Sequence, residues 1–189
     1  MSRLCQAAQL GLTLVEVLVT LLIFSIGLLG YAGLQGRVQI SHQEVYSRVY
    51  AINILTIMLD HIRANSRARE CYQLNKIELG TGYGDTFRCS SGVSTEAQQQ
   101  AEDSINAWSA LLQGEHATQG EKNIGGLLNA QGCIEFDSAS TMYVVTVVWQ
   151  GITEASPTES SCGKGIYGGA SNRLRRLVSG AFYVPDLQG

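Results

Sequence analysis

The chain has 189 residues, a formal net charge of −3 at pH 7 and only 15% charged residues. A nucleic-acid-binding surface needs clustered basic charge, so this balance argues against a nucleic acid partner. Two short arginine clusters, in 63–69 and 173–176, are interpreted as solvated surface or as partners of nearby acids. The 3 histidines show no ligand spacing, and no nucleophile elbow or phosphate loop appears. The sequence therefore predicts no enzyme, no cofactor and no metal site.

A nearly pure apolar run extends from Leu12 to Leu34, and its only ionisable side chain is Glu16. About 20 apolar residues span a bilayer, whereas the apolar region of a secretory signal peptide has about 7–15. Thr13, Thr20 and Ser25 can bond back to their own helix. An unpaired carboxylate in lipid costs roughly 3 kcal/mol, so Glu16 needs a specific reason to be there.

The residues before this run carry one charge, Arg3, and end at Gly11. A short head, a Gly, a Glu five residues later and a long apolar helix resemble the class III signal of type IV prepilins. The resemblance implies that prepilin peptidase removes residues 1–11, cutting between Gly11 and Leu12, and methylates the new amine of Leu12. It also implies an assembly role for Glu16. Its carboxylate would pair with the amine of a neighbouring subunit and set axial register, as a buried polar group does in a coiled coil.

The apolar pattern continues past the membrane-length run as a helical stripe. No proline interrupts 12–64, which predicts one helix about 80 Å long at 1.5 Å per residue. Residues 12–34 are expected to form its membrane or filament-core half and 35–64 its amphipathic half. The stripe recurs at spacings of three and four: Val45, Val49, Ile52, Leu55, Leu59 and Ile62.

A second interpretation of the N-terminus is ordinary secretion. Gly30-Tyr31-Ala32 fits a small-x-small site for signal peptidase, and cleavage there would release a soluble periplasmic domain. The unbroken helical pattern across this point argues against it.

Cysteine usage agrees with export. Of the 5 cysteines, Cys5 would leave with the leader, and an even number remains in the head: Cys71, Cys89, Cys133 and Cys162. Such a set in an exported domain predicts disulfides, with three possible connectivities. Sequential pairing is favoured because each pair lies in one half of the head. Closely spaced Cys-x-x-Cys pairs, which a zinc site would use, are absent.

Residues 65–189 are expected to form one α+β head. The Gly- and Ser-rich stretch 71–94 predicts a disulfide-closed loop, and 95–113 predicts a helix. Thr95 and Gln98 have the spacing of a capping box, and Gly114 is a natural helix stop.

Strand patterns follow in the second half of the head. The sequence predicts a short strand at Cys133–Phe136, a central buried strand at Met142–Trp149 and a third strand within Arg173–Val184. Consecutive strands without crossover helices predict an antiparallel sheet, packed on the long helix.

The head also resembles minor pilins of the PilV type, through a set of short motifs: Asp103, Trp108, Leu111-Leu112, 132–136, 143–151, Cys162-Gly163 and Arg175-Arg176. This resemblance implies a type IV pilin-like fold and a subunit that helps initiate pilus assembly in a priming or tip complex. It implies as partners the other minor pilins, the major pilin and inner-membrane pilus assembly proteins. The subunit would cross the inner membrane once, with a periplasmic head, before entering the pilus.

Two other functions remain open at this point. A minor pseudopilin of a type II secretion system shares the N-terminal signal and the architecture. A signal-anchored periplasmic binding domain unrelated to filaments would need only the apolar helix and the head.

Overall fold

A computed structural model describes residues 13–75, 77–90, 92, 94–115, 118–119, 122–123, 126–156, 159–168 and 171–183. The chain divides into two compact units, Met1–His42 and Gln43–Gly189.

The first unit is helical over the residues described. Helix α1 runs from Leu14 to Ala64, so the prediction of one unbroken helix from the apolar run to the head is confirmed from Leu14 onward. Every side chain from Thr13 to His42 is exposed. The apolar surface of this segment is therefore uncovered within its own unit.

The second unit contains the remaining helical elements and a four-stranded antiparallel sheet of order β1-β4-β5-β6. Strand β5 lies inside the sheet, as its β-branched and aromatic sequence predicts. A separate pair, β2 and β3, forms a small hairpin. The bounds are η1 Ser66–Tyr72, β1 Leu79–Gly80, α2 Thr95–Gln113, β2 Thr118–Gln119, β3 Lys122–Asn123, β4 Gln131–Asp137, β5 Met142–Gln150 and β6 Arg175–Tyr183.

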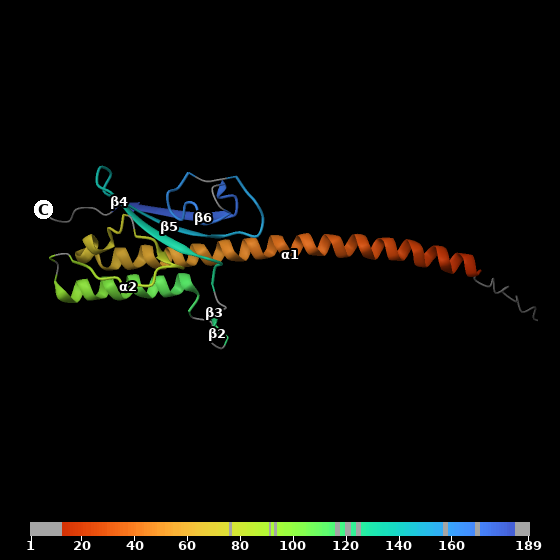
Figure 1. Cartoon of the computed structure of the whole chain (residues 1–189), viewed down its shortest axis with the longest axis horizontal. Coiled ribbons are helices and arrows are strands. Elements are labelled where there is room, and N and C mark those ends of the chain that lie inside the picture. The colour runs from red at the N-terminus through yellow and green to blue at the C-terminus, as the bar shows by residue number, and fades with distance from the viewer. Residues whose placement is uncertain are drawn as a thin grey trace, which may run out of the picture. The chain divides into compact units, whose positions relative to one another are not determined.

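The core of this unit lies between the sheet and two helices, the C-terminal part of α1 and α2 (Figure 1). The Trp108 indole is fully buried, and its Nε1 donates to the Ile54 carbonyl at 2.9 Å, which joins α2 to α1. Gly132 of β4 lies directly under Trp108, since a Cβ there would be 2.2 Å from the indole ring. The predicted α+β architecture, with a long N-terminal helix on an antiparallel sheet, is confirmed.

The buried face of α1 differs in part from the predicted stripe. Leu55, Leu59 and Ile62 are buried as expected, but Val45, Val49 and Ile52 are 59%, 53% and 44% exposed. Their place in the core is taken by Ala51, Ile54 and Met58. Periodicity identifies the apolar positions of a helix. Which of those positions are buried depends on where the head packs along the helix.

Helix α2 has the predicted extent, with a different N-terminal cap. It ends at Gln113, and the C-cap residue Gly114 has a φ of 74°, the left-handed conformation expected of a C-cap glycine. The capping-box prediction is wrong, because Ser94 is the N-cap and makes no side-chain cap bond. The Gln98 amide instead donates to the Cys89 carbonyl at 2.6 Å.

Three predicted strands are present with shifted ends, and three short ones were missed. β4 and β6 begin and end within two residues of the predicted bounds, except that Val184 lies outside the described residues. β1, β2 and β3 each have 2 residues, too few to show a periodic pattern. The stretch predicted as a disulfide-closed loop therefore also contributes an edge strand.

Candidate functional site

Glu16 lies in the first turn of α1, and Thr13 caps that turn. The Glu16 N–H donates to the Thr13 carbonyl at 3.1 Å and to its Oγ1 at 3.3 Å. A Thr side chain accepting from the backbone three residues later is a standard N-cap. A carboxylate in this turn is also favoured by the helix dipole.

The carboxylate of Glu16 differs from the other polar groups of the apolar run. The hydroxyls of Thr20 and Ser25 donate to the Val17 and Leu21 carbonyls at 2.9 and 2.7 Å, so the helix satisfies them internally. No described residue bonds the Glu16 carboxylate, which is exposed. Between Thr13 and Leu34, the structure thus presents one carboxyl group without a described partner on a largely apolar helical surface.

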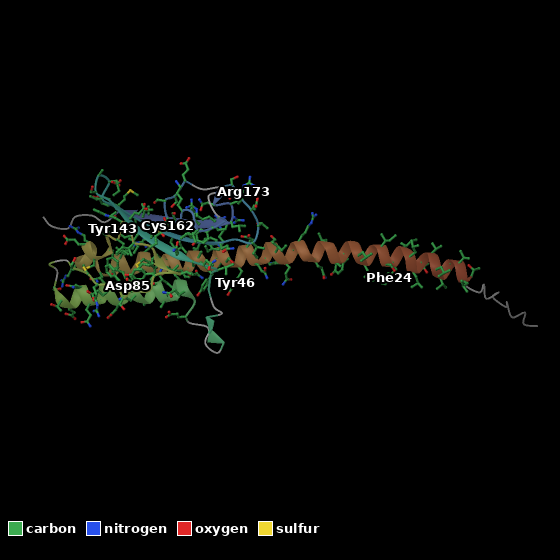
Figure 2. All side chains as sticks on the ribbon, viewed as in Figure 1. Phe24, Tyr46, Asp85, Tyr143, Cys162 and Arg173 are labelled. Atoms are coloured by element: carbon green, nitrogen blue, oxygen red, sulfur yellow. A yellow bond between two sulfur atoms is a disulfide. The ribbon has the colours of Figure 1, made fainter. Side chains whose placement is uncertain are left out.

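That surface is long and continuous. By length and composition, α1 is the one helix in the described part of the chain that could cross a membrane, with a mean hydropathy of 2.3 in its most apolar window. Phe24, labelled in Figure 2, is 63% exposed on this segment. Its apolar neighbours are exposed alike: Leu14, Val15, Leu18, Leu22, Ile23, Ile26 and Leu29.

The predicted cleavage and methylation positions, Gly11 and Leu12, lie outside the described residues, as does Cys5. Their roles remain predictions.

The structure joins Cys71 to Cys89 and Cys133 to Cys162, which is the sequential order. The second disulfide lies in a small apolar cluster of its own, beside the fully buried ring of Tyr167. Arg175 donates to the Cys162 carbonyl at 2.8 Å, which holds that cluster against β6.

A ladder of polar side chains on α2 holds the segment that carries Cys89. Asn106 bonds both the N–H and the carbonyl of Phe87, at 2.8 and 3.2 Å. One turn earlier, Glu102 accepts from the Cys89 N–H at 2.9 Å. That hydrogen bond, followed by one from Gln98, lowers the pKa of the Glu102 carboxyl. Side chains four residues apart on a helix thus bond the backbone of alternate residues of an extended segment.

Glu44 ties the β5–β6 connection to α1. Its Oε1 accepts from the N–H groups of Ile152 and Thr153 at 2.9 and 3.1 Å, and lies 3.4 Å from a guanidinium nitrogen of Arg176. Burial opposes ionisation of Glu44, but the backbone hydrogen bonds and the Arg176 charge outweigh it and lower its pKa below the ordinary 4.5. Beside this group is an open cleft of about 320 Å³. Arg176 thus pairs with a nearby acid, as do Arg63 with Asp60 and Arg173 with Glu154.

Sequence reasoning missed two features of these sites. Glu44 carries no local pattern that separates it from a solvated helix residue. The cap was visible in principle, since Thr13 and Glu16 have the Ser/Thr-x-x-Glu spacing of a helix start. Among the described residues, no group of three His, Cys, Asp or Glu side chains could hold a metal ion.

Comparison with known families bears on the N-terminus. Residues 6–32 match the family model of the prokaryotic N-terminal methylation motif. The match supports a type IV pilin-like or pseudopilin subunit. Such a motif indicates a structural subunit that prepilin peptidase processes, and it is consistent with inner-membrane anchoring through α1. No curated protein and no solved structure matches the chain.

Proposed function

We propose that this chain is a minor pilin of the PilV type, which helps to initiate type IV pilus assembly in a priming or tip complex. The observation that carries the proposal is Glu16: a carboxylate without a described partner, on an exposed apolar helix, inside the matched methylation motif.

The first step is processing. Prepilin peptidase cuts between Gly11 and Leu12 and methylates Leu12, which removes Arg3 and leaves an amine at the start of the apolar helix. Glu16 is then the fifth residue of the mature chain. An unpaired carboxylate in lipid costs roughly 3 kcal/mol, so Glu16 needs a cationic partner there.

The second step is assembly. The Thr13 cap holds the backbone of the first turn, so the Glu16 side chain is left to bind outside its own helix. Pairing with the N-terminal amine of a neighbouring subunit offsets the burial of both charges and fixes the axial offset between helices. The exposed apolar side chains of α1 first face lipid and then the helices of neighbouring pilins. The partners are the other minor pilins, the major pilin and inner-membrane assembly proteins.

The features that favour a minor pilin over other pilins lie in the head. Its two disulfides suit a periplasmic domain on a single-pass anchor, because that compartment is oxidising. The PilV-type motifs include Trp108, which joins α2 to α1, and Arg176, which bonds the β5–β6 connection.

Two alternatives share parts of this description. A minor pseudopilin of a type II secretion system has the same signal, and it is favoured if the purified protein co-isolates only with secretion-system subunits. A signal-anchored periplasmic binding domain would keep its N-terminus or lose it near residue 33.

The decisive measurement is the intact mass of the full protein purified from membranes in a neutral detergent. We expect a chain that starts at N-methylated Leu12. A retained Met1, or a start at Gly33, would reject the pilin function and leave the binding domain.

A further inference from the structure

The four-stranded sheet has two unlike edges. At one edge β1 is 2 residues long, and Leu79 is fully buried beneath α2. At the other, β6 is 9 residues long. Among the residues the structure describes, the backbone of 177–183 hydrogen-bonds only in the ladder with β5. Alternate N–H and carbonyl groups along that edge therefore point outward without a described partner.

Among the residues the structure describes, none of the features that usually protect an edge strand is found along the outer edge of β6. Proteins block such edges with short strands, lysines, prolines, bulges or a covering element. From Leu177 to Tyr183 the strand has no charged residue and no proline, and its register with β5 is continuous over all 9 residues. Tyr183 is 60% exposed, and Ser179 and Ala181 are exposed as well. An edge of this kind is a template for another strand.

The side chains of the edge define what fits it. Gly180 faces α1, since a Cβ there would lie 2.9 Å from Leu55 and 3.0 Å from Leu59. Because side chains alternate along a strand, Ser179 and Ala181 share the opposite, exposed face. The small side chains of Ser179 and Ala181 lie between the larger ones of Leu177 and Tyr183 on this face. A strand that pairs with β6 could therefore place large side chains opposite Ser179 and Ala181.

We propose that the outer edge of β6 binds an extended, uncharged segment of another protein chain by strand addition, with bulky apolar side chains opposite Ser179 and Ala181. Main-chain hydrogen bonds supply the affinity in this mode of recognition, and side-chain pockets at alternate positions supply the specificity. A second copy of β6 fits less well. Antiparallel pairing about Gly180 would place Ser179 opposite Ala181 and leave the centre unfilled, and pairing about Ser179 would fill only one of the two positions, with Leu177 opposite Ala181.

The inference does not depend on the filament role, and it is tested in cells that make the full chain. A photo-crosslinking amino acid replaces Ser179 or Ala181, and matched controls carry it at Leu128 or Ile166, which are 60% and 51% exposed elsewhere on the head. We expect adducts from positions 179 and 181 alone. Mass spectrometry should place them two residues apart within one uncharged segment of another chain.

A pair of lysine variants completes the test. Ala181→Lys puts a charge on the edge and should reduce the adduct yield from position 179 at least tenfold, whereas Leu128→Lys should leave it unchanged. Thermal unfolding of both purified variants in neutral detergent checks that they fold. Adducts confined to a second copy of β6, scattered adducts, or no adducts from a folded protein would overturn the proposal. The N-terminal mass is measured on the same samples, so failure here is separable from failure of the proposed function.

Discussion

The two halves of α1 are both apolar, but they are built for different surroundings. Ile26 in the first half is 63% exposed, whereas Ile62 in the second half is 1% exposed. The first half has an apolar surface on all sides and one acid, Glu16. In the second half, the head buries one face of the helix between Ala51 and Ile62. An apolar helix that is uncovered all round needs lipid or other helices, whereas a striped helix needs its own domain.

The largest expected effect is on filament incorporation, and it comes from replacing Glu16, the one acid in the first half of α1. Glu16→Ala should leave processing intact and reduce recovery of this subunit in sheared filaments at least tenfold, because the neighbour's amine loses its counter-charge. Immunoblots of membrane and filament fractions measure this. Ser25→Ala is the matched control, since the Ser25 hydroxyl is satisfied by the Leu21 carbonyl. Unchanged recovery of Glu16→Ala would remove the proposed pairing.

The second prediction makes the same substitution in both halves. Ile62→Ala should lower the free energy of unfolding of the head by about 2–5 kcal/mol, since it leaves a cavity in the core. Ile26→Ala should change it by less than about 0.5 kcal/mol, because the side chain touches no part of a folded core. Denaturant titration of the full chain in neutral detergent compares them. Equal effects would show that the halves do not differ as described.

The third prediction concerns the segment that follows the second half. Replacing Cys71 and Cys89 by serine together should cost about 3 kcal/mol on the chain-entropy model, given a sequence separation of 18. A clearly smaller loss would mean that the polar ladder from α2 holds the segment without the covalent bond. Chemical denaturation of the oxidised proteins measures the difference. Cys5→Ser is the control, because Cys5 is expected to leave with the leader.

The smallest expected effect on stability is that of replacing Glu44 of α1, which accepts hydrogen bonds from the β5–β6 connection. The pKa of Glu44 is lowered in the folded state, so its stabilisation is complete above the ordinary value of 4.5 and is lost as pH falls through the lower folded-state value. Glu44→Gln should therefore destabilise the head by under about 1 kcal/mol at pH 7.

The Glu44 prediction is checked by thermal unfolding of wild type and variant across pH. The difference between them should shrink below about pH 4.5. A difference that stays constant into the acid range would point to lost packing rather than lost charge.

Local patterns were enough for the features that depend on neighbours in sequence. The apolar run, the acid within it, helix α2 with its Gly114 stop and the strand predicted at Met142–Trp149, which the structure extends to Gln150, each have a composition or period typical of one element. The same reasoning failed where a residue has two possible local uses. Gln98 has the spacing of a capping residue, but the structure uses it to hold Cys89.

The sequence by itself determined that this chain has a membrane-length helix with a processing-type signal, an α+β head and an even set of head cysteines. The helix, the head and its cysteines follow from hydrophobicity, period and spacing, which are properties of a continuous stretch of chain, whereas the signal rests on a resemblance to type IV prepilins and on the matched methylation motif. Only the tertiary structure decided that Ala51, Ile54 and Met58 are covered while Val45 and Val49 are not. It also decided that Glu44 meets Arg176 across the fold and that β6 lies at the edge of the sheet. Long-range contacts of this kind depend on how the sheet and helices are placed, and no local pattern encodes that placement.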